Sequence, residues 1–182
     1  MSKHYPWLLF DADGTLFDYN RAEVTALRKT FESFRLPFED EYLDVYQRIN
    51  HGLWQALEKQ EIKPDVLRVR RFELLSEALK IDGSPSEMST TYVEQLGLCA
   101  DLIDGAHEVL QALHGKCKLA IVTNGLQAVQ RSRLAHSQIR NFIMDIIISE
   151  EIGAAKPQTE FFDIAFHRLG HPLKSDVLII GD

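Results

Sequence analysis

The sequence has only two cysteines, no long apolar run and fewer basic than acidic side chains. Its 182 residues contain 20 Lys plus Arg against 27 Asp plus Glu, which gives a formal net charge of -7. An acidic chain does not offer the positive surface that nucleic-acid backbones require, so we exclude nucleic acid as the main partner. The apolar runs, such as 177–180, are far shorter than the roughly 20 residues of a membrane span, so no membrane helix is expected.

The cysteines and the N-terminal segment indicate where the chain works. Cys99 and Cys117 lie on either side of an expected helix and lack CxxC spacing, so we expect two thiols and no metal or redox site. Segment 1–7 has neither a long apolar stretch nor a small-residue cleavage site, which argues against secretion. We expect a folded cytoplasmic chain.

Four short apolar segments are expected to form buried parallel strands. Each is continuously apolar, which is typical of a strand covered by helices on both faces. Amphipathic stretches with helical spacing precede the second and the fourth segment. This pattern predicts an α/β fold with a doubly wound, Rossmann-like parallel sheet. The segments are 7–10, 119–122, 146–148 and 177–180.

A helical domain is expected between the first and the second strand. The gap of about a hundred residues is too long for one crossover connection and too periodic for a loop. Asn20 and Glu23 have the spacing of a capping box at the start of the first helix of this insert. The predicted division is an α/β core formed by 1–15 and 100–182, with a helical cap at 16–99.

Polar residues follow the strands at their carboxyl ends, where open α/β sheets bind ligands. Three carboxylates at one edge repel one another unless a cation lies among them, so a hard divalent metal is indicated. Lys156 supplies the fixed positive charge that a phosphoryl group needs, and backbone N–H groups near Gly14 and Gly125 can cradle its oxygens. The segments concerned are Asp11-Ala12-Asp13-Gly14-Thr15, Thr123-Asn124-Gly125, Lys156-Pro157 and Gly181-Asp182.

These four segments, in this order, resemble the motifs of the haloacid dehalogenase superfamily of phosphohydrolases. The helical insert lies where members with a C1-type cap carry theirs. The resemblance implies that Asp11 is a nucleophile that forms an aspartyl-phosphate, and that Asp13 protonates the leaving oxygen and then activates water. Because the dehalogenases of the superfamily lack the second acid, Asp13 favours phosphate chemistry over carbon–halogen cleavage.

The same resemblance implies the other site residues. Thr123 binds phosphoryl oxygens and Lys156 steadies the charge on nucleophile and phosphate, which completes the catalytic set. The cofactor implied is Mg²⁺, with Asp11, the main-chain carbonyl of Asp13 and Asp182 as ligands. The residues implied or considered for substrate binding are Gly14, Thr123, Asn124, Gly125, Lys156 and Arg71.

A closer likeness is to the noncanonical pyrimidine 5'-nucleotidases of this superfamily, which implies a nucleoside monophosphate as the small-molecule partner. It rests on Asn50, Leu53-Trp54, Arg71-Phe72 and the run 149–157. For the cluster of Arg68, Arg70 and Arg71, a solvated helix face is the simpler interpretation. The functional alternative is that Arg71 holds a phosphate or a base edge. Trp54 is favoured as part of the cap core.

The sequence ends at Asp182, directly after the fourth apolar segment, whereas members of the superfamily continue. We therefore expect an apolar edge at 177–180 and a loosely held Asp182. Two alternatives to the nucleotidase stay open. One is an inactive truncated fragment or pseudoenzyme with a binding role, and the other is a sugar-phosphate phosphatase or phosphomutase with the same core motifs. The physiological substrate and the oligomeric state are not legible from the sequence.

Overall fold

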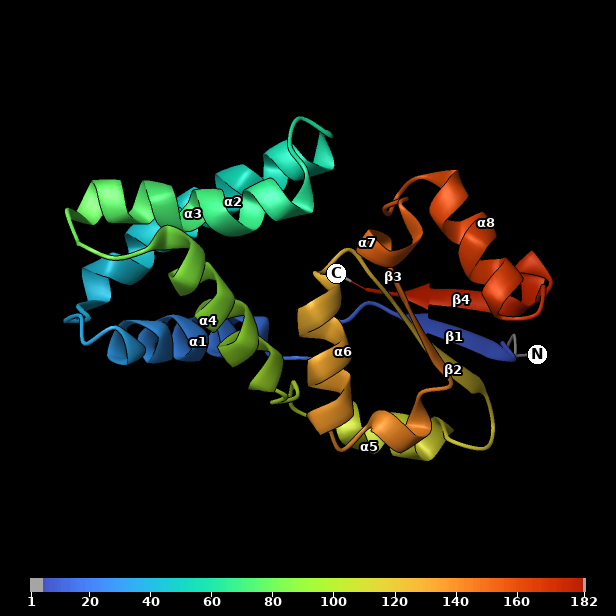
Figure 1. Ribbon diagram of the computed structural model, residues 1–182. Helices are drawn as coiled ribbons and strands as arrows, with labels where there is room; N and C mark the ends of the chain where they lie inside the picture. The colour runs from blue at the N-terminus through green and yellow to red at the C-terminus, as the bar shows by residue number, and fades with distance from the viewer. Residues whose placement is uncertain (1–4, 182) are drawn as a thin grey trace. The chain divides into compact units, whose positions relative to one another are not determined.

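A computed structural model describes residues 5–181. The chain forms two compact units (Figure 1). The first unit comprises the chain up to Arg21 together with the chain from Ala100 onwards, and the second comprises Ala22–Cys99. The first unit contains the parallel sheet, and the second is helical.

The parallel sheet of the first unit has the strand order β3-β2-β1-β4. Its strands are β1 (Trp7–Phe10), β2 (Lys118–Thr123), β3 (Asp145–Ile148) and β4 (Val177–Ile180). Phe10 lies opposite Ile121 of β2 and Ile180 of β4, so the carboxyl ends of three neighbouring strands reach the same edge. The predicted α/β fold with its parallel sheet is confirmed.

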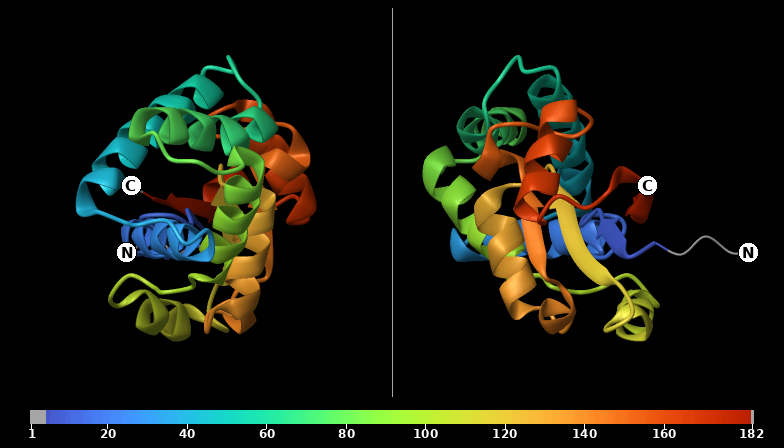
Figure 2. Two further views of the ribbon diagram at one scale, coloured as in Figure 1. Left: turned by 60° about the vertical axis from the view of Figure 1, so that its left-hand side comes forward. Right: turned by 90° about the vertical axis from the view of Figure 1, so that its right-hand side faces the viewer.

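Helices cover both faces of this sheet, which explains why its strands are apolar on both sides. One face forms a core with α5 (Ala106–Leu113) and α6 (Gln127–His136). The other face forms a core with α7 (Ser149–Ile152) and α8 (Thr159–Arg168). In the views of Figures 1 and 2, α8 lies above the sheet and α5 below it. Two short 3-10 segments complete the unit, η1 (Arg140–Phe142) and η2 (Lys174–Asp176).

Strand β4 is an outer strand of the sheet formed by residues 5–181. Its Leu178 and Ile179 are 38% and 48% exposed, whereas the residues of β1 are all buried. The apolar edge expected at 177–180 is therefore present.

The second unit is formed by α2 (Asp40–Glu58), α3 (Pro64–Leu79), α4 (Pro85–Leu98) and most of α1 (Tyr19–Ser33). Helix α3 packs against both α2 and α4 (Figure 1). Each of these three helices contributes one ring to an aromatic cluster in the core. Tyr46, Phe72 and Tyr92 are fully buried, with ring centroids 5.4 to 6.0 Å apart.

The start of α1 differs from the predicted capping box of Asn20 and Glu23. The helix begins before Asn20, and the carboxylate of Asp18 accepts a hydrogen bond of 3.0 Å from the backbone N–H of Arg21. A short side chain caps a helix only when it stands at the residue that precedes the first turn, and Asp18 holds that place. Glu23 is buried in the second unit instead.

Neither cysteine forms a disulfide within residues 5–181. Cys99 is buried and Cys117 half-buried, and both are present as thiols. Within the described part of the chain, no helix combines the length and the apolar character needed to cross a membrane.

Candidate active site

The loops that follow β1, β2 and β3 meet at the carboxyl edge of the sheet. Asp11 comes directly after β1, Thr123 is the last residue of β2, and Lys156 lies between α7 and α8. Direct contacts join the three loops, because Lys156 bonds to Asp11 and to the residue after Thr123. The structure thus brings Asp11 and Lys156 into direct contact and places Thr123 next to the residue that binds the Lys156 backbone.

Asp11 and Lys156 form an ion pair at this edge. The ammonium Nζ of Lys156 lies 2.8 Å from Oδ1 of Asp11, and the same oxygen accepts a hydrogen bond of 2.7 Å from the N–H of Ala12. The two side chains are 18% and 25% exposed, respectively. No group within residues 5–181 donates a hydrogen bond to the other oxygen, Oδ2. One carboxylate oxygen is thus fixed by two donors, and the other is available to attack phosphorus or to bind a cation.

Asn124 positions the backbone of Lys156. Its side-chain amide donates to the carbonyl of Lys156 at 2.9 Å, and its Oδ1 accepts the N–H of Lys156 at 2.8 Å. This two-point contact fixes the chain from which the ammonium extends to Asp11. Asn124 therefore acts on the lysine, using its amide oxygen and one of its two N–H donors.

Thr123 presents a hydroxyl at the end of β2. The residue is buried, and its Oγ1 accepts the N–H of Gly125 at 3.0 Å. The accepted bond orients the oxygen, which leaves its own proton free to be donated to a phosphoryl oxygen.

The N–H groups of Gly14 and Gly125 themselves donate within the chain. The N–H of Gly14 donates to the carbonyl of Phe17 at 3.1 Å, and that of Gly125 donates to Thr123. Gly14 has a φ of 77°, so it forms the tight turn after Asp13. These two bonds fix the loops after β1 and β2, whose neighbouring N–H groups are the ones predicted to cradle a phosphate.

Asp13 is held by two side chains of α6. Its Oδ2 accepts a hydrogen bond of 2.6 Å from Nε2 of Gln130, and its Oδ1 pairs with Nη1 of Arg133. Neither donor was predicted from the sequence. A signal was present, because Gln130 and Arg133 continue the inward stripe of Leu126 and Val129 at helical spacing. Polar residues on an apolar stripe indicate a buried polar contact.

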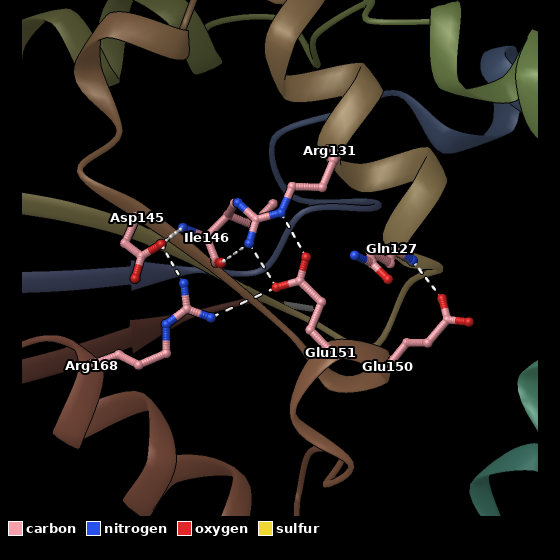
Figure 3. Close-up of polar contacts among 7 residues, drawn as sticks. All are labelled: Gln127, Arg131, Asp145, Ile146, Glu150, Glu151 and Arg168. Atoms are coloured by element: carbon pink, nitrogen blue, oxygen red, sulfur yellow. Dashed lines mark hydrogen bonds and ion pairs between the residues drawn. The ribbon is translucent and has the colours of Figure 1, made fainter.

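A charged network joins α7 to α6 and α8 (Figure 3). Helix α7 directly precedes the loop that carries Lys156. Arg131 donates two hydrogen bonds to Glu151, at 2.7 and 2.6 Å. Arg168 lies 3.7 Å from Glu151 and donates to Asp145 of β3 at 2.8 Å. The hydrogen bond from Arg131 lowers the pKa of Glu151, although partial burial acts against it. The network holds the segment between β3 and Lys156 in place, a run for which the sequence indicated only a family likeness.

The N-terminus of α6 receives a second acid from the same segment. Glu150 accepts the backbone N–H of Gln127 at 2.7 Å, as Figure 3 shows. A carboxylate at this position satisfies a first-turn N–H and faces the positive end of the helix dipole. The loop after β2 and the loop after β3 are therefore fixed to each other at two places.

The expected magnesium ligands are described in part. Asp182 lies outside the described residues. Asp11 offers a carboxylate oxygen, and Gly181 approaches it so closely that a Cβ on the glycine would lie 3.1 Å from Cβ of Asp11. The side chain of Asp13 is engaged by α6, which is compatible with coordination through its main-chain carbonyl alone. Within residues 5–181, no cluster of three His, Cys, Asp or Glu side chains suits a metal ion. Mg²⁺ is commonly held by one or two carboxylates with water and substrate oxygens, so this donor set fits it.

Arg71 lies inside the second unit, which corrects the solvated helix face expected for it. The residue is buried, its Nη1 donates to Oδ1 of Asn50 at 3.4 Å, and its guanidinium lies 4.5 Å from the ring centroid of Tyr92. Arg70 is exposed, as expected, and Trp54 is half-buried. Arg71 therefore belongs to the interior of the helical unit in this structure.

Comparisons with known proteins agree with this geometry. The sequence profile of the haloacid dehalogenase-like hydrolase family matches residues 8–182. Pyrimidine 5'-nucleotidase YjjG of Escherichia coli is 33% identical over 98% of this chain and 77% of its own length. Pyrimidine 5'-nucleotidase PynA of Streptococcus pneumoniae is 31% identical over 98% of this chain and 76% of its own length. A crystal structure of the HAD-hydrolase YfnB of Bacillus subtilis, bound to magnesium, superposes with a TM-score of 0.92. It is 36% identical and covers 99% of this chain and 81% of its own.

Proposed function

The chain belongs to the haloacid dehalogenase-like hydrolases and is a phosphoric monoester hydrolase, and we propose that it is a Mg²⁺-dependent 5'-nucleotidase acting on pyrimidine nucleoside monophosphates. The observation that carries the proposal is the Asp11–Lys156 pair, in which a lysine fixes one oxygen of a carboxylate and leaves the other available. The substrate class is supported by two relatives that are named as pyrimidine 5'-nucleotidases.

In the proposed reaction, Oδ2 of Asp11 attacks the phosphorus of the substrate. The bond from phosphorus to the ester oxygen breaks as the aspartyl-phosphate forms, and Asp13 gives its proton to the departing oxygen. Water then attacks phosphorus, Asp13 takes a proton from it, and inorganic phosphate leaves as Asp11 is regenerated. Lys156 and the hydroxyl of Thr123 balance the charge on the phosphoryl oxygens in both steps.

Magnesium is proposed to be held by Asp11, the main-chain carbonyl of Asp13 and Asp182. When bound, it supplies Lewis-acid neutralisation of the negative charge on the phosphoryl group. The metal in the YfnB crystal structure supports this cofactor for the family fold.

Specificity is proposed to come from the helical segment 16–99, acting as a cap on the core formed by 1–15 and 100–182. Support comes from its position in the chain, because it is inserted directly after the loop that carries Asp11 and Asp13. Arg71 is proposed to contribute through the interior of this cap, where Asn50 holds it, instead of by the substrate contact considered from the sequence. We also retain the cytoplasmic location as a proposal, in keeping with the thiols of Cys99 and Cys117.

The test is phosphate release from a panel of uridine, cytidine, adenosine and guanosine monophosphates and glucose 6-phosphate, with Mg²⁺ or with EDTA. We expect release that requires Mg²⁺ and is fastest on the two pyrimidine nucleotides. Faster release from glucose 6-phosphate would assign the chain to the sugar-phosphate phosphatases. A folded chain that binds these ligands and releases no phosphate would support a pseudoenzyme with a binding role.

A further inference from the structure

The Asp13 carboxylate is gripped by two donors that lie one helical turn apart on α6. Gln130 bonds to Oδ2 and Arg133 to Oδ1, so each oxygen has a different partner. A carboxylate has about four lone-pair sites, so two remain, which can carry the proton for the leaving oxygen and later accept one from water. The side chain is 29% exposed and is therefore held in place without being sealed from substrate.

Because Gly125 has no side chain, the Gln130 side chain can pass beside it to reach Asp13. A Cβ at residue 125 would lie 2.3 Å from Nε2 of Gln130 and 2.9 Å from its Cδ, closer than real Cβ atoms approach. Gly125 is absent from the residues with positive φ, so its backbone does not itself demand glycine. The glycine of the loop after β2 is thus required by the side chain that holds Asp13.

Burying the charged side chain of Arg133 costs free energy, because its guanidinium is removed from water. Its side chain is 0% exposed, its guanidinium lies 5.4 Å from the ring centroid of Phe17, and Nε and Nη2 find no hydrogen-bond partner within residues 5–181. A buried ion pair adds little net stability compared with apolar residues of the same volume. Net stability therefore does not explain the burial of this cation, whose ion-pair partner is Asp13.

We propose that Arg133 and Gln130 are positioning residues that aim the Asp13 carboxylate at the leaving oxygen and at the attacking water. The inference rests on the proposed function, in which Asp13 is the general acid and base. Helix α6 begins just after Thr123, Asn124 and Gly125, so one rigid element joins the phosphate-binding hydroxyl to the proton-transfer group. Because Gln130 and Arg133 lie on a helix, they hold the Asp13 carboxylate more accurately than residues of a loop would.

The test compares two leaving groups in Arg133→Met and Gln130→Met. Uridine monophosphate releases a strongly basic alkoxide that needs a proton, whereas p-nitrophenyl phosphate releases a weak base that does not. We expect Arg133→Met to lower kcat on uridine monophosphate by about 100-fold, which is the scale of lost general acid catalysis. KM should change less than about threefold, because Lys156 and Thr123 are intact. The first-turnover release of p-nitrophenolate should also fall less than about threefold.

The matched control is Arg140→Met, which removes an exposed arginine from η1. It should leave both reactions close to wild type. Arg133→Lys restores a cation beside Asp13 and should recover part of the lost rate on uridine monophosphate. If Arg133→Met does not fold, the same difference between substrates is measured in Gln130→Met and Arg133→Lys.

Equal losses on the two substrates, or no loss on uridine monophosphate, in a folded variant would overturn the positioning role and leave the proposed function intact. A folded wild-type chain that acts on neither substrate would overturn the proposed function, and this inference with it.

Discussion

Asn124 and Lys156 are joined by two hydrogen bonds. The side-chain oxygen of Asn124 accepts the backbone N–H of Lys156 at 2.8 Å, and the side-chain N–H of Asn124 donates to the Lys156 carbonyl at 2.9 Å. The bonds join the loop after β2 to the loop after β3. Because the ammonium of Lys156 in turn contacts Asp11, the charge in the site is placed through the backbone of a neighbouring loop. This relationship makes the lysine a fixed point charge, as phosphoryl transfer requires.

Replacing Asn124 by Ala should lower kcat by roughly 10- to 100-fold, because a small displacement of a catalytic group has effects of that size. The variant keeps the Lys156 ammonium, so the fall in kcat measures the effect of its position alone. Steady-state kinetics on uridine monophosphate provide the measurement, and Asn141→Ala, at an exposed residue of η1, is the control. Unchanged kinetics in Asn124→Ala would show that Lys156 needs no such support.

The hydroxyl of Thr123 should matter more than its shape. Thr123→Val keeps the volume and β-branching but removes the donor, and we expect kcat to fall about 100-fold, as for the loss of one oxyanion donor. Thr123→Ser keeps Oγ and should remain within about tenfold of wild type. The same kinetic assay decides, and equal losses in the two variants would assign Thr123 a packing role.

Acid should weaken the network around Glu151. Hydrogen bonding to Arg131 lowers the pKa of Glu151 below its ordinary value of 4.5, so the unfolded chain takes up this proton more readily than the folded chain. The stabilisation is therefore present above pH 4.5 and is lost as the pH falls through the folded pKa.

Accordingly, Glu151→Gln should lower the free energy of unfolding by about 1.5 kcal/mol at pH 7, the size of a hydrogen bond to a charged group. The difference from wild type should shrink below pH 4.5. Urea unfolding at several pH values gives the measurement, with Asp163→Asn, at an exposed residue of α8, as control. A difference that stays constant with pH would remove the ionic interpretation.

Alkaline conditions should weaken the second unit. Burial raises the pKa of Tyr46 well above its ordinary value of 10.0, against the opposing effect of Arg71. The neutral phenol is favoured in the folded state, so its contribution is complete below pH 10.0 and is lost as the pH rises further. Tyr46→Phe should raise the pH at which the chain unfolds in base, followed by circular dichroism. Half-buried Tyr42→Phe is the control, and an equal shift in both variants would contradict the assignment.

The strands and the site loops were accessible from sequence for a simple physical reason. A strand covered on both faces is continuously apolar, so 7–10 and 119–122 stand out from their surroundings. Once these are strands of one parallel sheet, Asp11 and Thr123 must lie at the same edge, whatever the intervening chain does.

The contacts that hold Asp13 and Arg71 in place could not be predicted from the sequence, because each depends on a partner that is remote in sequence. Gln130 is 117 residues from Asp13, and nothing local distinguishes it from a solvated glutamine except its place on an apolar stripe. Arg71 is buried because Asn50 and an aromatic ring from other helices receive it. The cap at Asp18 was missed because Asn20 is equally suited by residue type, and only the start of the helix decides between them.

The most direct test of the account is to trap the phosphoryl group on Asp11. Wild-type chain and Asp11→Asn are mixed with Mg²⁺ and uridine monophosphate carrying ³²P, quenched in acid during turnover, and assayed for label that remains on the protein and is released by hydroxylamine. We expect acid-stable, hydroxylamine-sensitive label on the wild-type chain and none on Asp11→Asn, which should also release no phosphate. Turnover without labelled protein, or label retained by Asp11→Asn, would contradict the aspartyl-phosphate mechanism.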